Sequence, residues 1–144
     1  MHPYPHIYRV SAAGELSGPV GLRSAGLPEL ATAPPPEFDG PGGTWSPETL
    51  LVGALADCFI LTFRAVARAA RLEWRQLECR VEGVLERADG VTQFTRYETS
   101  AELRVPAGTD EKRAMELLER AERGCLISNS VRGTRHLTAR ILSA

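Results

Sequence analysis

Cysteine is scarce in this sequence, and neither sign of charge is in excess. Three cysteines lie far apart in 144 residues, at positions 58, 79 and 125. An odd number at such wide spacing excludes a disulfide scaffold and favours the reducing cytoplasm as the compartment. No CxxC pair is present, so we expect neither a zinc site nor any other bound metal.

The charged residues nearly balance, since 17 are basic and 18 acidic, which gives a net charge of −1. Without a basic surplus we expect no binding to nucleic acid. The first ten residues, MHPYPHIYRV, lack the order of basic, apolar and small residues that is typical of a signal peptide. The length and the 43% share of hydrophobic residues predict one globular domain over residues 1–144.

The first third of the chain carries weak signals. Residues 1–33 predict short strands, with candidates at 6–13 and 19–25 among Gly and Pro turns. Residues 34–45, PPPEFDGPGGTW, predict a loop. No Lys-Ser or Lys-Thr follows its glycines, so this loop is not a phosphate loop.

A long apolar helix is predicted over residues 46–72. Ser46 suits the N-cap, Pro47 the first helical position, and Glu48 the first turn, where its charge complements the helix dipole. Charged residues occupy one narrow stripe, and the other faces are apolar, which predicts a helix buried nearly all round. The charges interrupt the apolar run before about 20 residues, so we do not expect a membrane span. A second subunit is the economical cover for such a helix.

In the rest of the chain, apolar and polar residues alternate as in strands, before and after a second predicted helix. Strands are predicted at 77–87 and 92–105, joined by an Asp89-Gly90 hairpin turn. A helix follows from an N-cap at Thr109 to a stop at Gly124, and a last strand follows Gly133. This order predicts an α+β fold with a largely antiparallel sheet and a long buried central helix that carries Cys58.

The three thiols differ in their expected environments. Cys79 lies on the apolar face of its strand, where a core packing role is expected. Cys125 follows a helix stop and opens the next turn, so backbone amides favour its thiolate, and by this argument it is the more activated thiol. Cys58 lies in mid-helix and gains nothing from the dipole. It needs a nearby cation, which an acid such as Glu48 would hold.

Other assignments remain open for several of these residues. Glu48 also fits a surface partner of the helix dipole, and Cys58 a buried bystander. His136 is the other conventional activator of a cysteine, although its alternating strand is more typical of a sheet residue.

Two segments resemble the osmotically inducible protein C and organic hydroperoxide resistance family, OsmC/Ohr. They are EFDGPGG followed by SPETLLVGALADCF, and AERGCLISNS further along. The family has a Gly-rich loop, Asn-Pro-Glu, and a helix with a cysteine ten residues past the Glu. Its second cysteine follows a helix end. The match extends over residues 36–142 in order and spacing.

The resemblance implies an intertwined α+β homodimer that reduces organic hydroperoxides without a cofactor. Cys58 then corresponds to the peroxidatic thiol, Cys125 to the resolving thiol, and Glu48 to the acid that positions an arginine. The resemblance also implies a dithiol reductant, often a lipoylated protein.

The sequence departs from the family pattern at four places. One is the acidic Asp57 before Cys58, where the family residue is usually small and neutral. Asn-Pro-Glu is replaced by Ser46-Pro47-Glu48, and the family's Cys-Pro by Cys125-Leu126. The arginine of the N-terminal loop is absent from GELSGPVG, so Arg23 is the best candidate by position, with Arg9 behind it. The alternative functions are a dimeric redox-sensing or small-molecule-binding protein on the same fold and, more distantly, a cysteine hydrolase that uses Cys125 and His136.

Overall fold

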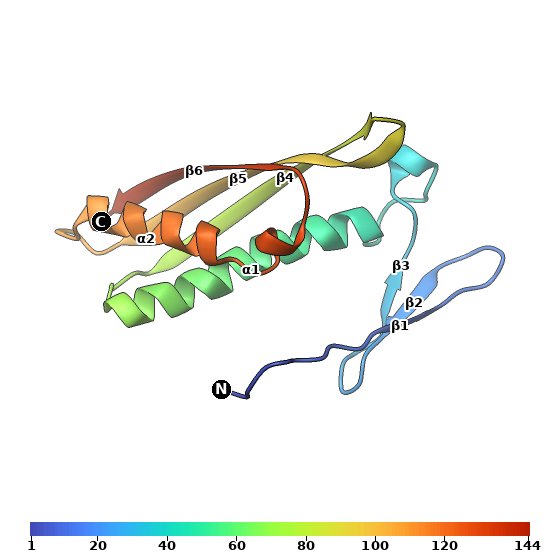
Figure 1. Ribbon diagram of the computed structural model, residues 1–144, viewed down its shortest axis with the longest axis horizontal. Helices are drawn as coiled ribbons and strands as arrows, with labels where there is room; N and C mark the ends of the chain where they lie inside the picture. The colour runs from blue at the N-terminus through green and yellow to red at the C-terminus, as the bar shows by residue number, and fades with distance from the viewer. The chain divides into compact units, whose positions relative to one another are not determined.

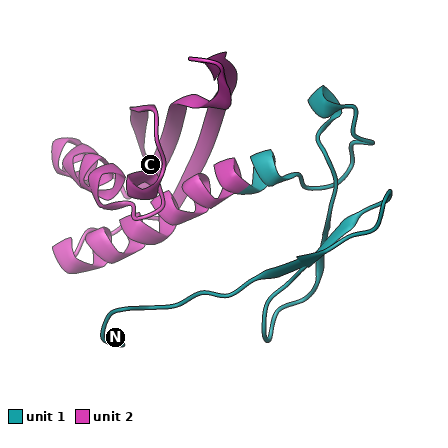
Figure 2. Cartoon of the chain, turned by 45° about the vertical axis from the view of Figure 1, so that its right-hand side comes forward, with its two compact units in different colours: residues 1–50 teal, residues 51–144 magenta.

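The computed structural model describes all residues from 1 to 144 and contains two compact units, residues 1–50 and residues 51–144 (Figure 2). The first unit holds a small antiparallel sheet. Its strands are β1 (Ser11–Ala13), β2 (Val20–Arg23) and β3 (Leu30–Thr32), in the order β1-β2-β3. The first two strands confirm the predicted candidates but are shorter, and β3 was not assigned from the sequence. A 3-10 turn, η1 (Pro36–Phe38), lies within the predicted Pro/Gly loop.

The long helix α1 (Pro47–Ala70) begins where the sequence places it. Ser46 caps it, because its hydroxyl accepts a hydrogen bond from the Thr49 amide at 3.1 Å, and Thr49 Oγ1 accepts one from the Ser46 amide at 2.9 Å. This reciprocal pair satisfies two backbone N–H groups that a helix start otherwise leaves without partners. The helix continues without a break through Gly53.

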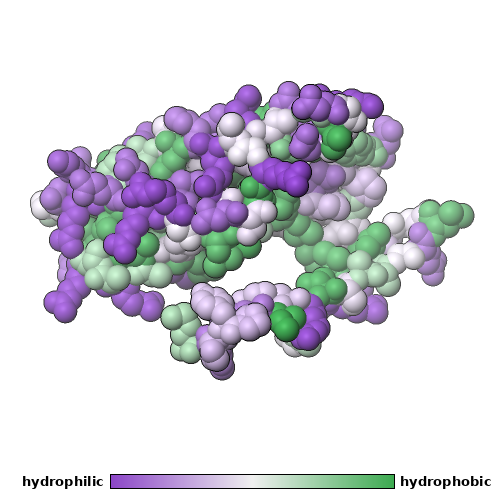
Figure 3. All heavy atoms as spheres, viewed as in Figure 1, coloured by the Kyte–Doolittle hydropathy of each residue, from purple (hydrophilic) through white to green (hydrophobic).

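Within one chain, α1 is buried along a single line. Its buried residues, four positions apart, are Leu55, Phe59, Phe63 and Ala67. The other apolar positions stay partly exposed, and Leu61 keeps half of its surface in solvent. Figure 3 shows apolar side chains at the surface along this helix. Although α1 is long and apolar enough to cross a membrane, its buried line packs into the core, which makes it the core helix of a soluble domain.

The second unit contains a three-stranded sheet with both helices on one face (Figure 1). Its strands are β4 (Gln76–Ala88), β5 (Val91–Val105) and β6 (Thr134–Ser143), in the order β4-β5-β6. The β4–β5 pair is antiparallel, and its tight turn has positive φ at Asp89 (51°) and Gly90 (78°), as type I′ turns require. The β5–β6 pair is parallel, so the connection has to cross over through a helix.

That crossover is α2 (Glu111–Gly124), which is capped by Asp110 rather than by Thr109. The predicted cap was wrong by one residue, because Asp110 accepts the Arg113 amide at 3.0 Å, whereas the Thr109 hydroxyl donates to the Pro106 carbonyl at 2.7 Å. The helix packs its apolar stripe onto the sheet beside α1. The buried cluster comprises Phe59, Phe63, Ala67, Leu77, Ala101, Leu103, Val105, Ala114, Leu117, Leu118 and Ala121. Overall the α+β class and the largely antiparallel pairing are confirmed.

Candidate active site: two thiols and a turn of amides

The end of α2 brings Cys125 to the middle of α1. A Cβ placed on Gly124 would lie 3.6 Å from the methyl group of Thr62, so α2 ends close to this part of α1. Thr62 stands one helical turn after Cys58, with 3.8 Å between the Cys58 Sγ and the Thr62 Oγ1. The next residue after Gly124 is Cys125, and its thiol is a hydrogen-bonding neighbour of Cys58. The fold thus joins thiols that are 67 positions apart in the sequence.

Cys125 also starts a helical turn. The Asn129 amide donates to the Cys125 carbonyl at 3.0 Å, and the Ser130 amide donates to the Ile127 carbonyl at 2.9 Å, leading into the 3-10 helix η2 (Ser128–Ser130). The amides of Leu126 and Ile127 precede these bonds and have no backbone acceptor. Such groups at a helix start need other acceptors. Both amides lie close enough to the Cys58 sulfur to lower its pKa.

This arrangement lowers the pKa of Cys58. Burial alone would raise the pKa, but the hydrogen bonds to the sulfur outweigh it. In order of decreasing effect they come from the Ile127 amide, the Cys125 thiol, the Thr62 hydroxyl and the Leu126 amide. Cys58 is also only half-buried, so a small molecule has access to the thiolate.

Cys125 has the opposite character. It is completely buried, and burial raises its pKa. The hydroxyl and amide of Ser128 donate to its sulfur and oppose this effect, whereas its hydrogen bond to Cys58 and the charge of that thiol raise the pKa further. The expectation that Cys125 is the more activated thiol was therefore wrong. The amides of the turn do favour a thiolate, but two of them face Cys58 rather than the cysteine that begins the turn.

Cys79 lies on β4 and packs against the core, as its alternation predicts. Burial raises its pKa to about 12, and the negative charges of Glu122 and Cys125 add to the effect. It is therefore a neutral thiol at physiological pH, although it lies near enough to Cys125 for their charges to interact.

Arg23 and Glu48 belong to the other compact unit, residues 1–50. Arg23 ends β2, is largely exposed, and makes an ion pair with Glu29 at 2.7 Å, which raises the pKa of the guanidinium. Glu48 lies in the first turn of α1, and its Oε2 is buried without any hydrogen-bond partner. A buried carboxylate oxygen without a donor is costly, so this atom calls for one.

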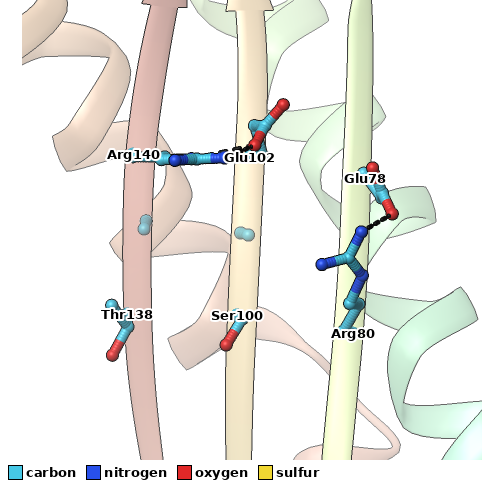
Figure 4. A pocket seen from close by; sticks show the side chains of 8 residues that line it. Glu78, Arg80, Ser100, Glu102, Thr138 and Arg140 are labelled. Carbon is cyan, nitrogen blue, oxygen red and sulfur yellow. Dashed lines mark hydrogen bonds and ion pairs between the residues drawn. The ribbon is translucent and has the colours of Figure 1, made fainter.

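His136 lies on the exposed side of β6, which puts it on the sheet face opposite the helices and the thiols. This face carries a polar hollow of about 230 Å³, in which Arg80 pairs with Glu78 and Arg140 pairs with Glu102 (Figure 4). Its charges are matched with one another, and none of its residues contributes a thiol. The hydrolase alternative, which needs His136 beside Cys125, has no geometric support.

Comparison with known proteins gives a family match that includes the segments of the two thiols. The sequence profile of the family described as OsmC-like protein matches residues 40–139, which include both Cys58 and Cys125. The chain belongs to the OsmC-like protein family. YmaD, a protein of Bacillus subtilis strain 168, is 32% identical to this OsmC-like chain over 117 residues, covering 79% of this chain and 78% of YmaD.

Solved structures agree on the fold of this OsmC-like protein. An OsmC-like protein of unknown function from Vibrio cholerae superposes with a TM-score of 0.82 at 17% identity, covering 96% of this chain and all of that one. An organic hydroperoxide resistance protein OsmC from Legionella pneumophila has a TM-score of 0.76 at 25% identity, covering 96% and 98% of the two chains. The first comparison supports the fold alone, and the second is a relative whose name refers to hydroperoxides.

Sequence reasoning missed Thr62 and the amides of Leu126 and Ile127 as parts of this site. A threonine one turn after the cysteine was a visible signal, because residues four apart share a helix face. The amides carry no side-chain signature. Only the chain path after α2 shows which sulfur they face.

Proposed function

We propose that this OsmC-like protein is a thiol peroxidase that reduces organic hydroperoxides to alcohols. The observation that carries the proposal is the pairing of two thiols with unlike properties. Cys58 is half-buried and has a lowered pKa, while Cys125 beside it is buried and has a raised pKa. An accessible thiolate is suited to attack, and a protected thiol in contact with it is suited to resolve the product.

In the proposed first step the Cys58 thiolate attacks the terminal oxygen of ROOH. The O–O bond breaks, a sulfenic acid forms on Cys58, and the alkoxide takes up a proton and leaves as the alcohol. In the second step the Cys125 sulfur attacks the Cys58 sulfenic sulfur, and a disulfide forms with release of water. An external dithiol, such as a lipoylated protein, then reduces the disulfide by two exchange steps and is itself oxidised.

The active unit is proposed to be a homodimer in the cytoplasm. Much of the apolar surface of α1 stays partly exposed in one chain, which supports a second copy as its cover. The unsatisfied Oε2 of Glu48 supports the role of this residue as the acid that holds an arginine. Arg23 is the proposed cation. To reach Glu48, it would leave its exposed ion pair with Glu29, which contributes little stability.

Glu48 is further proposed to serve the Cys58 of the other subunit. Ten residues of helix rise about 15 Å, which is too far for one guanidinium to contact both groups. A kink near Gly53 would have shortened this distance, but α1 has no break there. An antiparallel crossing of two copies about a twofold axis would bring the start of one α1 towards the middle of the other.

A titration with cumene hydroperoxide tests the proposed chemistry. One equivalent should join Cys58 to Cys125 and leave Cys79 as a free thiol, as read by peptide mass spectrometry. In Cys125→Ser, oxidation should stop at a sulfenic acid that dimedone traps, and excess peroxide should convert it to sulfinic acid. A disulfide that includes Cys79, or no loss of thiols, would refute the peroxidase proposal.

The second candidate is a redox-sensing protein that uses the same thiols without turnover. The engagement of Arg23 by Glu29 favours it, because that pair withholds the proposed cation from the site. Steady-state consumption of cumene hydroperoxide with dihydrolipoamide separates the two functions. A peroxidase consumes many equivalents per chain, whereas a sensor stops after one.

A further inference from the structure

We propose that the backbone amides of Leu126 and Ile127, together with the hydroxyl of Thr62, form a pocket of neutral donors that holds the Cys58 thiolate. The inference deepens the proposed function and rests on it, because the same thiolate attacks the hydroperoxide. It adds a source of activation that lies wholly within residues 51–144. The cation expected from the sequence would then add to a thiolate that neutral donors already stabilise.

The path of the backbone carries the first part of the argument. Cys125 is the C-cap of α2, with φ −67° and ψ 108°, and its carbonyl opens the next turn, in which Ile127 is already helical with φ −70° and ψ −45°. The carbonyl of Cys125 accepts from Asn129, so the turn closes behind the amides of Leu126 and Ile127 and leaves them free of backbone partners. The Ser130 hydroxyl donates a hydrogen bond to the Leu126 carbonyl at 2.7 Å, which further fixes the orientation of the turn.

Thr62 supplies the second part from another element. Its Oγ1 lies 3.8 Å from the Cys58 Sγ, and its methyl group faces Gly124. A threonine hydroxyl can rotate to donate to a thiolate. The pocket thus has donors from α1 on one side and from the turn after α2 on the other.

The titratable groups around the pocket are few. Cys125 contacts Cys58 directly, and Cys79 of β4 lies near enough to Cys125 and to Glu122 of α2 for their charges to interact. Asp57, the neighbour of Cys58 on α1, is exposed to solvent. Any pH profile of Cys58 therefore has to be separated from the titration of Cys125, to which it is linked.

Leu126→Pro removes one donor with little disturbance. Proline has no amide N–H, and it is favoured at the first position of a helical turn, which is the place of Leu126. The preceding residue must be extended, as Cys125 is. Leu126→Ala is the matched control, because it removes the exposed side chain and keeps the amide. Thr62→Val removes the hydroxyl, with Thr62→Ser as its control.

The measurement is the rate of Cys58 alkylation by iodoacetamide as a function of pH, with each thiol located by peptide mass spectrometry. Each donor deletion should raise the pKa of Cys58 by about one unit, so alkylation below that pKa should slow about tenfold. Leu126→Ala and Thr62→Ser should follow the wild-type profile. The same variants in a Cys125→Ser background separate the profile of Cys58 from that of its neighbour.

Profiles of Leu126→Pro and Thr62→Val that match their controls would overturn the inference. Should Leu126→Pro fail to fold by circular dichroism, the Thr62 pair decides in the same way. Because alkylation needs no turnover, the two proposals fail separately. A shifted profile in a protein that consumes no hydroperoxide keeps the donor pocket and refutes the peroxidase, whereas an unchanged profile in an active peroxidase refutes the pocket alone.

Discussion

The two compact units of this chain use their residues in contrasting ways. Residues 51–144 surround a cluster of eleven buried residues, drawn from both helices and the long strands. Residues 1–50 form a sheet of strands only three or four residues long. Ala33 is the only buried hydrophobic residue among residues 1–50. Short strands without a core have little independent stability. The second unit is therefore stabilised by a hydrophobic core of its own, whereas most residues of the first unit are exposed.

The proposed site divides along the same line. The thiols, Thr62 and the turn of amides all belong to residues 51–144, whereas Glu48 and Arg23 belong to residues 1–50. Groups fixed by a packed core can hold hydrogen bonds to a thiolate without large adjustment. The charged pair, proposed to act across the dimer, depends on assembly. Three predictions test this division, and a fourth tests the cap of α2 within the second unit.

The largest expected effect is restoration of activity in mixed dimers. Glu48→Ala and Cys58→Ser subunits should each be inactive alone. If Glu48 serves the partner's thiol, a heterodimer places both lesions in one site and leaves the other site intact. Co-expression with two different affinity tags and sequential purification should then recover about half of the wild-type peroxidase rate.

The mixed-dimer result has a clear contrary outcome. Purified heterodimers that remain inactive would show that Glu48 acts within its own chain. Heterodimers formed from two Cys58→Ser subunits with different tags are the control, and they should show no activity at all.

A core substitution should separate the two units in stability. Leu118 is fully buried in α2, so Leu118→Ala should lower the free energy of unfolding by about 2–5 kcal/mol. Leu27 in the first unit is 66% exposed, so Leu27→Ala should change the free energy of unfolding by no more than about 0.5 kcal/mol. Urea denaturation followed by circular dichroism measures both. Equal losses would show that the first unit buries Leu27 in the folded assembly.

The capping assignment of α2 gives a smaller effect. Asp110→Ala removes the acceptor for the Arg113 amide and should cost about 1 kcal/mol. Asp110→Asn retains an acceptor and should be nearly neutral. Thermal unfolding compares the two, and a loss in Asp110→Asn as large as that in Asp110→Ala would contradict the assigned cap.

The smallest expected effect belongs to the proposed cation. Arg23→Ala should raise the pKa of Cys58 by about half a unit, since partly exposed charges interact weakly. The Cys58 thiolate is the attacking form, so alkylation near neutral pH should become slower as this pKa rises. Arg9→Ala is the control. A shift in Arg9→Ala with none in Arg23→Ala would reassign the cation to Arg9.

The sequence alone determined the elements whose signals are local. The Ser46 cap, the Asp89-Gly90 turn and the stripe of Ala114, Leu117, Leu118 and Ala121 depend on neighbours within a few positions, and the structure confirms each. The spacing of Glu48, Cys58 and Cys125 was sufficient to indicate the family, which the match over residues 40–139 confirms. The α+β class followed from the order of these elements.

Only the tertiary structure decided which thiol is activated. From the sequence, the amides after Gly124 were assigned to Cys125, because that residue begins the turn. In the fold the turn packs beside α1, and the amides of Leu126 and Ile127 face Cys58. A hydrogen bond depends on the position of its acceptor in space, and here the acceptor is 68 and 69 positions away along the chain. The parallel pairing of β5 with β6 was undetermined for the same reason, because an alternating strand has the same sequence pattern in either direction.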